Sequence, residues 1–155
     1  RLGQRAELET LQQASAVTTI SRALRDDLVQ RGVAAKKIVV VPNGVDLERF
    51  YPVERDPELV RQHELQDQFV IGFIGSFYFY EGLDTLIDAM MILLGHRRDI
   101  KLLLVGEGEA DLMLRQRVPR RWRDQIIFLG NVPHDEVSRY YSVMDVLVYP
   151  RKRSR

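Results

Sequence analysis

From Phe69 onward, short apolar runs alternate with amphipathic segments, and this alternation limits the fold more than any other feature. The apolar runs are rich in branched and aromatic residues and predict strands at about 69–74, 100–105, 126–129 and 146–149. The segments between them have apolar residues at helical spacing and predict helices at about 83–94, 110–118 and 135–142. Strands that alternate with helices form a parallel sheet through right-handed crossovers. We therefore expect an α/β fold, a Rossmann-like doubly wound parallel sheet with strand order 3-2-1-4.

The chain before Phe69 shows a shorter and less regular pattern. We expect a polar helix at Arg1–Ala14 and a short strand at Ala16–Ile20. Ser21 is a favourable cap for a following helix, and Gly32 is a favourable stop. The apolar run Ile38–Val41 predicts a buried strand that ends in a turn.

The segment Val45–Arg55 has no periodic pattern, and we place a domain boundary within it. Asp56 and Pro57 then start a helix that runs to about His63. The sequence begins without Met and ends in a basic run directly after an apolar strand. We interpret it as a fragment of a longer chain.

The loop Gly75–Gly82 is the first candidate for a functional site. In open parallel sheets, ligands bind beyond the carboxyl ends of the strands, and this loop follows the first strand of the regular region. A tight turn without a ligand is the alternative interpretation. In the expected strand order the first and fourth strands are neighbours, so Pro150-Arg151-Lys152 should face this loop across one cleft.

Composition and missing motifs exclude several classes of protein. A net charge of +1 argues against a dedicated nucleic-acid binder, and the absence of cysteine excludes thiolate chemistry. No apolar run approaches the roughly 20 residues of a membrane helix. The sequence contains neither a G-x-x-x-x-G-K-[ST] loop nor a G-x-S-x-G elbow. His63, His96 and His134 form no metal-ligand pattern, and we expect surface or cap-region roles for them and no metal.

Two further segments have both a functional and a structural interpretation. Gly106-Glu107-Gly108 partly matches a dinucleotide fingerprint, but a turn after the second strand explains it better. A basic cluster surrounds Trp122, and it indicates either an anionic lipid or nucleic-acid contact or a solvated helix end with Trp122 in the core. We favour the second interpretation. The members of the basic cluster are Arg115, Arg117, Arg120, Arg121 and Arg123.

Six motifs in fixed order carry a resemblance to a known family. They are TTIS at 18–21, VVVPNGVD at 39–46, FIGS at 73–76, YEGLD at 80–84, LVGEG at 104–108 and VLVYP at 146–150. Together they resemble glycosyltransferase family 4, retaining enzymes with the two-domain GT-B fold. The YEGLD segment resembles a branch associated with exopolysaccharide synthesis.

The resemblance implies a domain organisation. Residues 1–45 would be the C-terminal end of the acceptor-binding domain, and residues 46–68 the hinge region and a linker helix. Asn43 and Gly44 would lie at the hinge. Residues 69–155 would form the first part of the nucleotide-sugar-binding domain.

The resemblance also implies donor-binding residues. The backbone from Gly75 to Gly82 would approach the donor diphosphate, and residues near Val105 and Asn131 would lie near the base. The complete donor-binding set is Gly75, Ser76, Glu81, Gly82, Val105, Gly106, Asn131, Val132, Arg151 and Lys152. No cofactor is implied, because the nucleotide sugar is a substrate.

Two departures from the family pattern matter. Many members hold the diphosphate with an Arg and a Lys at the positions that Ser76 and Glu81 occupy here. We therefore hypothesise that Arg151 and Lys152 supply the missing positive charge from across the cleft. The family's paired-glutamate motif, E-x7-E, would lie beyond Arg155, so the catalytic residues are unknown and the fragment alone should be inactive.

The resulting expectation is a hexosyltransferase that moves a sugar from a nucleotide-sugar donor to a hydroxyl of a glycan or lipid-linked acceptor. Nucleic acid is not an expected partner. We expect a cytoplasmic protein that can contact the inner face of the membrane peripherally. The alternatives are a non-catalytic nucleotide-binding module, which the missing clamp favours, and an interaction domain that docks through the Trp122 region.

Overall fold

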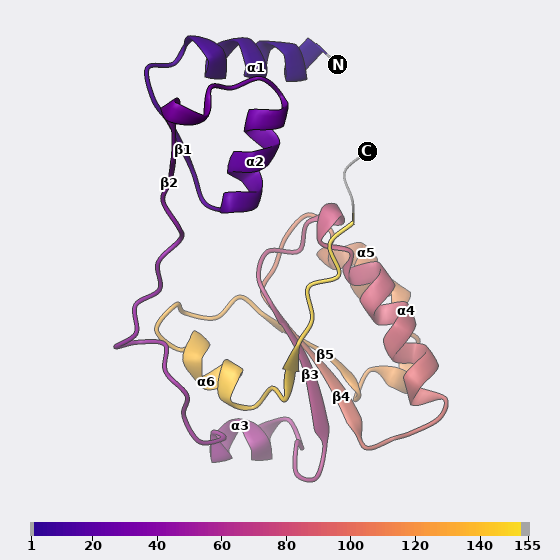
Figure 1. Cartoon of the computed structure of the whole chain (residues 1–155). Coiled ribbons are helices and arrows are strands. Elements are labelled where there is room, and N and C mark those ends of the chain that lie inside the picture. The colour runs from indigo at the N-terminus through magenta and orange to yellow at the C-terminus, as the bar shows by residue number, and fades with distance from the viewer. Residues whose placement is uncertain (1, 153–155) are drawn as a thin grey trace. The chain divides into compact units, whose positions relative to one another are not determined.

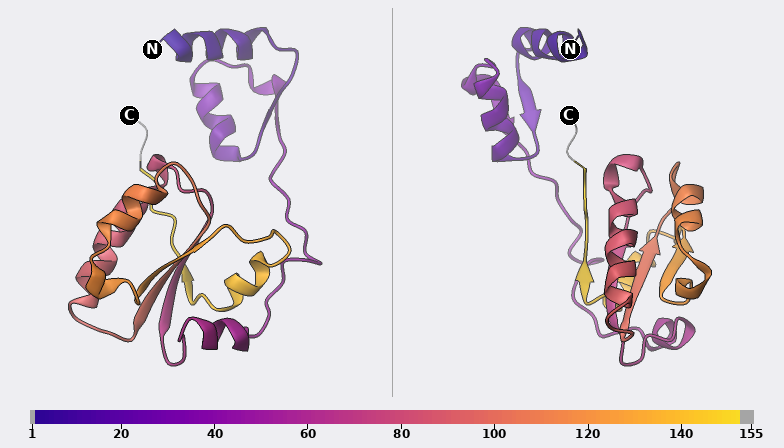
Figure 2. Two further views of the ribbon diagram at one scale, coloured as in Figure 1. Left: turned by 180° about the vertical axis from the view of Figure 1, so that it is seen from behind. Right: turned by 90° about the vertical axis from the view of Figure 1, so that its right-hand side faces the viewer.

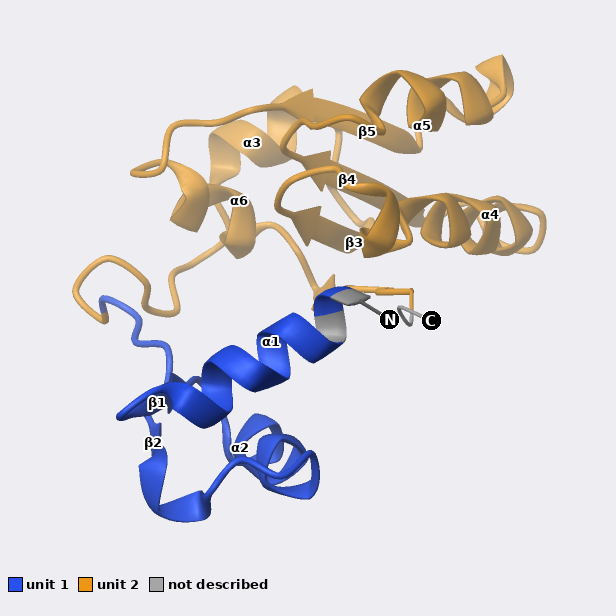
Figure 3. Cartoon of the chain, turned by 90° about the horizontal axis from the view of Figure 1, so that it is seen from above, with its two compact units in different colours: residues 1–46 blue, residues 47–155 orange. Residues whose placement is uncertain are grey.

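The structure of the chain is a computed structural model that describes residues 2–152 (Figure 1). It contains two compact units, which Figure 3 distinguishes by colour, with the boundary between Asp46 and Leu47. Arg1, which the first predicted helix includes, and Arg153–Arg155, the predicted end of the second domain, lie outside the described residues.

The first unit is a small α/β element with two parallel strands that pair from Val17–Ile38 to Thr19–Val40. As predicted, the Ser21 hydroxyl caps the second helix by accepting a hydrogen bond from the Leu24 N–H at 3.2 Å. Gly32 follows this helix with a φ of +95°, which glycine adopts readily. The elements are α1 (Leu2–Gln13), β1 (Val17–Thr19), α2 (Arg22–Gln30), η1 (Ala35–Lys37) and β2 (Ile38–Val40).

The prediction of a buried strand at Ile38–Val41 is wrong in part. Ile38 is buried in a cluster with Val17 and Val33, but Val39 and Val41 are 55% and 53% exposed. Side chains alternate between the two faces of a strand, and the residues that pack on this small cluster come from α1, α2 and Ala14. A continuous apolar run therefore does not show here that both faces of the strand are covered.

The second unit contains a four-stranded parallel sheet with the order β5-β4-β3-β6. This order confirms the predicted order 3-2-1-4. The elements are α3 (Pro57–Gln62), β3 (Phe69–Ile74), η2 (Phe79–Glu81), α4 (Leu83–Leu94), β4 (Ile100–Val105), α5 (Asp111–Arg117), η3 (Arg120–Trp122), β5 (Ile126–Gly130), α6 (Val137–Ser142) and β6 (Val146–Leu147).

Helices cover both faces of this sheet, as both views in Figure 2 show. One apolar core joins α4 and α5 to one face, through residues such as Phe73, Leu104 and Ile87. A second core joins α3 and α6 to the other face, through residues such as Leu59 and Leu103. Because α6 leads the chain from the edge strand β5 back to the far side of β3, the direction of winding reverses between β3 and β6.

The last strand is shorter than predicted. Only Val146 and Leu147 pair with β3, whereas the sequence predicts a strand over 146–149. The Val148 N–H still donates to the Gly72 carbonyl at 2.9 Å, but Pro150 has no N–H to continue the ladder. The Tyr149 side chain instead donates its hydroxyl to the Ile74 carbonyl at 3.3 Å.

A buried lysine lies within the central sheet. Lys101, the second residue of β4, is only 7% exposed and donates from Nζ to the carbonyl of His63 at 2.7 Å. His63 ends α3 and is half-buried, so its predicted place on the surface is wrong in part, whereas His96 is exposed as predicted. Burial, and then the charge of Lys101, lower the pKa of His63 below the ordinary value of 6.5.

This shift predicts a pH dependence of stability. Between its lowered pKa in the folded state and its ordinary value, His63 binds more protons in the unfolded chain. We therefore expect the free energy of unfolding to fall as the pH decreases from about 7 to about 5. Urea titrations across this range measure the slope. His63→Gln should reduce the slope, and His96→Gln at the exposed site should retain it; an unchanged slope in His63→Gln would contradict the prediction.

Candidate functional site

A cleft of about 340 Å³ lies at the carboxyl edge of the sheet. Its walls come from the ends of three neighbouring parallel strands, the loops that follow them, and one residue of α6. In doubly wound sheets this edge is where ligands bind. The lining residues are Ile74, Gly75, Ser76, Val105, Gly106, Glu107, Asn131, Val132 and Val137.

The strand ends are joined to one another by backbone hydrogen bonds. The Gly75 N–H donates to the Val105 carbonyl at 3.0 Å, and the Gly106 N–H donates to the Gly130 carbonyl at 2.8 Å. Gly106 has a φ of +126°, and a Cβ atom there would lie 1.9 Å from the Gly75 carbonyl oxygen. Only glycine allows this close approach, so the floor of the cleft consists of backbone.

Phe77 anchors the loop Gly75–Gly82 to the core. Its side chain is fully buried, and its ring lies 6.0 Å from the Phe73 ring and 6.3 Å from the Phe128 ring, measured between centroids. Its N–H donates to the Glu107 carbonyl at 2.9 Å, and its carbonyl accepts from the Ala110 N–H at 3.0 Å. The loop is therefore fixed near its start while Ser76 remains exposed at the cleft.

Glu107 is the acidic residue of the cleft wall. Its carboxylate accepts a long hydrogen bond of 3.4 Å from the Asn131 N–H and is otherwise exposed. This bond links the loop after β4 to the loop after β5. As predicted, Gly106-Glu107-Gly108 forms the turn between β4 and α5.

A second group of candidate residues joins the loop to the segment after β6. The Arg151 guanidinium binds the Glu81 carboxylate through two hydrogen bonds of 3.1 and 3.0 Å. Lys152 binds Asp84 through Nζ at 2.6 Å, and its N–H donates to the Tyr80 carbonyl at 2.9 Å. These bonds confirm that the loop and the basic tail are neighbours.

Gly82 allows this junction to close. It has a φ of +74°, and a Cβ atom there would lie 2.4 Å from the Pro150 carbonyl oxygen. Any other residue at this position would be strained and would push the tail away from the loop.

The charges of this junction are matched within it. The Glu81 side chain is 8% exposed, whereas the Arg151 side chain is 69% exposed. The hydrogen bond to Glu81 raises the pKa of Arg151, and the hydrogen bond from Lys152 lowers the pKa of Asp84. Arg151 and Lys152 therefore neutralise two carboxylates of their own chain, which our hypothesis of an uncompensated positive charge did not anticipate.

The structure thus divides the predicted donor-binding set into two groups. Gly75, Ser76, Val105, Gly106, Asn131 and Val132 line the cleft, and Glu81, Gly82, Arg151 and Lys152 form the junction beside it. The predicted hinge residues Asn43 and Gly44 are exposed and outside regular secondary structure.

Sequence reasoning missed several residues of the site. Glu107 lies within the LVGEG motif and Phe77 directly follows the FIGS motif, so their position beside strand ends could have identified them. Val137 comes from α6, and its place in the cleft wall depends on tertiary structure.

Tyr149 bonds to the end of β3 and packs on Phe73 at 5.2 Å between ring centroids. Burial first, and then interactions with Tyr141 and Glu81, raise the pKa of Tyr149 to about 12.

Two kinds of feature are absent from residues 2–152. Within them, no group of three or more His, Asp or Glu side chains is arranged to hold a metal ion. Nor does this part of the chain contain a helix long and apolar enough to cross a membrane.

His134 is exposed, and its ring contacts Phe50 at 5.6 Å between centroids.

The second unit has the fold of a Rossmann-like parallel α/β domain. The family model described as Glycosyl transferases group 1 matches residues 68–154, which is more than half of the chain. The chain belongs to this family. A second model, Glycosyltransferase Family 4, matches residues 1–49.

Curated relatives are glycosyltransferases that are much longer than this chain. It is 28% identical over 145 residues to 2-deoxystreptamine glucosyltransferase of Streptomyces kanamyceticus. It is 25% identical over 152 residues to the capsular polysaccharide biosynthesis glycosyltransferase CapM of Staphylococcus aureus. Each match covers 90% of this chain and 38% of the relative, so the chain spans about two fifths of their length.

Solved structures share the fold. Anabaena Alr3699/HepE, in complex with UDP and glucose, matches with a TM-score of 0.79 and 24% identity over 97% of this chain and 42% of that one. Sucrose-phosphate synthase from Thermosynechococcus elongatus matches with a TM-score of 0.72 and 25% identity over 95% of this chain and 37% of that one. The parallel α/β fold therefore matches GT-B glycosyltransferase structures.

The junction generates a prediction about stability. Arg151→Gln leaves the Glu81 carboxylate buried without its cation, so it should lower the urea midpoint more than Lys152→Gln, whose partner Asp84 is more exposed. The double variant Glu81→Gln/Arg151→Gln should be less destabilised than the sum of its single variants. Additive single effects would show that the two side chains are not coupled.

Proposed function

We propose that the full-length protein is a retaining hexosyltransferase that moves a sugar from a nucleotide-sugar donor to an acceptor hydroxyl. The observation that carries this proposal is the backbone-floored cleft at the carboxyl ends of β3, β4 and β5, in a chain of a glycosyltransferase family. The names of CapM and of the HepE complex support polysaccharide or glycolipid synthesis with a nucleotide-sugar donor. The YEGLD segment supports the exopolysaccharide-type branch.

The proposed chemistry breaks the bond between the anomeric carbon and the diphosphate oxygen. A new bond forms to the acceptor oxygen, the acceptor proton is lost, and a nucleoside diphosphate leaves. The backbone of the loop Gly75–Gly82 approaches this leaving group without a bound metal, and the N–H groups of the loop that do not bond to Val105 and Glu107 stabilise its negative charge. Val105, Gly106, Asn131 and Val132 contact the nucleoside.

The junction residues play a changed role in this proposal. Nε and Nη2 of Arg151 bind Glu81, while the exposed remainder of the guanidinium can meet the diphosphate. Lys152 acts mainly by holding the tail against the loop through Asp84 and Tyr80.

The rest of the proposal concerns the domain organisation. Residues 1–45 are the end of an acceptor-binding domain, residues 46–68 contain the linker helix, and Asn43-Gly44 forms the hinge. The acceptor is a glycan or a lipid-linked glycan, reached at the inner face of the membrane. The catalytic constellation is completed by paired glutamates beyond Arg155.

Donor binding by the full-length protein tests the role of the cleft. Calorimetric titration with UDP-, GDP- and ADP-sugars should identify one base that binds best. Ser76→Glu places a negative charge beside the proposed diphosphate, so it should weaken that binding by about tenfold. Ser76→Arg restores the cation that many family members carry there and should tighten binding.

Gln66→Glu is the matched control. It adds the same charge before β3, at the opposite edge of the sheet from the cleft, and should leave donor binding unchanged. Equal effects of Ser76→Glu and Gln66→Glu would refute the placement of the diphosphate. Analysis of the anomeric configuration of the product tests retention.

The chain of residues 1–155 alone should not transfer sugar, because it lacks the proposed paired glutamates. We expect no product above background when it is incubated with labelled donors and acceptor, while the full-length protein turns over under the same conditions. Detection of product with the 155-residue chain would refute the assignment of the catalytic pair.

A further inference from the structure

The basic cluster at the end of α5 carries a feature that the proposed function does not use. Trp122 is half-buried and packs against the core, as the structural interpretation of this segment predicts. All members of the surrounding cluster are exposed: Arg115, Arg117, Arg120, Arg121 and Arg123. Some of these arginines pair with carboxylates and others have no ion-pair partner within residues 2–152, and an arginine without such a partner can bind an external anion.

A pocket of about 290 Å³ opens between two of these arginines. This volume is near the lower end of the range of about 300–1,000 Å³ that small-molecule sites occupy. It shares no lining residue with the cleft at the strand ends. The lining residues are Arg115, Val118, Arg123, Ile126 and Phe128.

The pocket has an excess of positive charge. Arg115 binds Asp111 through Nε at 2.8 Å, and its guanidinium carbon lies 4.7 Å from the centroid of the Phe128 ring. Within residues 2–152, the Arg123 side chain has no ion-pair partner. One guanidinium is thus free to bind an anion, and a second is oriented over an aromatic ring.

The remaining lining is apolar. Val118 and Ile126 are buried, and Phe128 is half-buried with its ring turned edge-on to Phe77. An inorganic anion alone would leave these surfaces uncovered, whereas an uncharged apolar ligand would leave Arg123 unused. A ligand that fills the pocket needs both characters.

We propose that this pocket binds a small ligand that joins an oxyanion, a phosphate or carboxylate, to a flat apolar group. The oxyanion binds Arg123 and the unpaired N–H groups of Arg115, and the flat group packs on Phe128 and Ile126. This ligand is distinct from the nucleotide-sugar donor and occupies a separate site on the same domain.

Phenyl phosphate is the probe that tests this proposal in the full-length protein. By calorimetric titration at constant ionic strength, it should bind more tightly than inorganic phosphate. Arg123→Gln should weaken its binding by about tenfold, because a charge-assisted hydrogen bond is lost. Phe128→Leu should abolish the preference for phenyl phosphate and leave the binding of inorganic phosphate unchanged.

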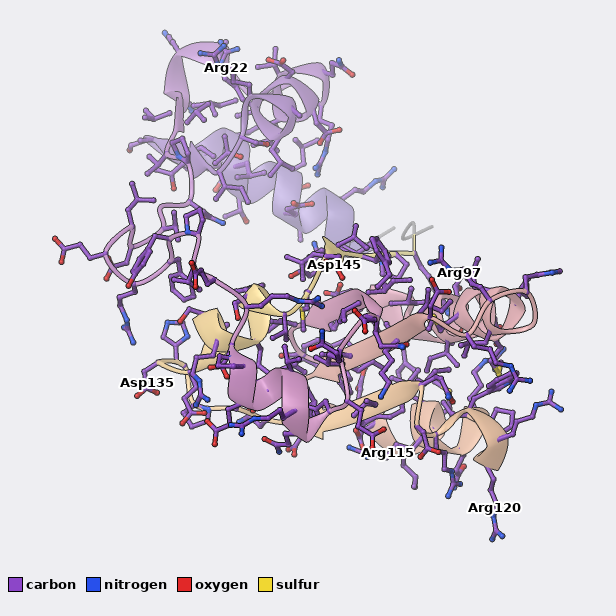
Figure 4. All side chains as sticks on the ribbon, turned by 90° about the horizontal axis from the view of Figure 1, so that it is seen from below. Arg22, Arg97, Arg115, Arg120, Asp135 and Asp145 are labelled. Atoms are coloured by element: carbon purple, nitrogen blue, oxygen red, sulfur yellow. The ribbon has the colours of Figure 1, made fainter. Side chains whose placement is uncertain are left out.

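Arg120→Gln provides a matched control. Arg120 belongs to the same cluster, has no ion-pair partner within residues 2–152, and points outward into solvent (Figure 4). This variant removes the same charge and should leave the affinity unchanged. Equal weakening by Arg120→Gln and Arg123→Gln would overturn the proposal, because the effect would then be one of general charge.

Two further measurements keep the outcome decisive. Arg115→Gln should also weaken binding, which tests the pocket independently of any effect of Arg123→Gln on folding. Saturating nucleotide sugar should not displace phenyl phosphate, and Ser76→Glu should not weaken the binding of phenyl phosphate. Displacement would place the probe in the strand-end cleft and overturn the second site, whereas failure of the donor titration alone would leave this site supported.

Discussion

The parallel pairing of β3 on both of its edges is the constraint on which the second unit depends. β4 pairs along the whole of β3 on one side, and β6 pairs with Ile71 and Gly72 on the other. Right-handed crossovers require α4 and α5 to cover one face of the sheet, and the return to the far side of β3 places α6 on the other face. The reversal of winding opens the carboxyl edge beside β3, which brings the loop after it and the tail after β6 together.

The candidate site combines a cleft that has one acidic side chain in its wall with a junction whose charges are neutralised. Backbone from Gly75 and Gly106 forms the floor of the cleft, and the acidic side chain of the wall, Glu107, bonds to the Asn131 N–H. Beside the cleft, Glu81 and Asp84 form ion pairs with Arg151 and Lys152 and neutralise their charges. In the proposed function, a diphosphate in this cleft would depend mainly on those backbone N–H groups that do not bond within the protein, since they attract anions without the cost of desolvating a full charge.

Much of this arrangement could be predicted because it follows from local sequence pattern. Helical periodicity placed α4, and continuous apolar runs placed β3 and β4, at their observed bounds, and the Rossmann arrangement then predicted the strand order. Strand ends mark ligand sites in this topology, which identified the loop at Gly75, and the family resemblance added Val105 and Asn131, which line the same cleft. The exposure of Val39 could not be predicted, because it depends on what packs against a strand, whereas Pro150 could have indicated the early end of β6.

Side-chain partners were the main limit of prediction. The sequence shows that Glu81 carries a charge but not that Arg151 faces it, and nothing local indicates that Lys101 is buried beneath His63. Such pairs form between residues far apart in the chain, and their geometry depends on the completed fold. The position of Val137 in the cleft also depends on the completed fold, because it requires α6 to lie on the second face of the sheet.

The Glu81–Arg151 pair has a consequence for how such a domain can diverge. A lysine at position 81, as in many family members, would place two cations face to face where one carboxylate now binds Nε and Nη2 of a guanidinium. A substitution at only one of these two positions would therefore give a less stable protein. Positions 81 and 151 should covary among close relatives, with acidic and basic residues exchanged as a pair or lost together.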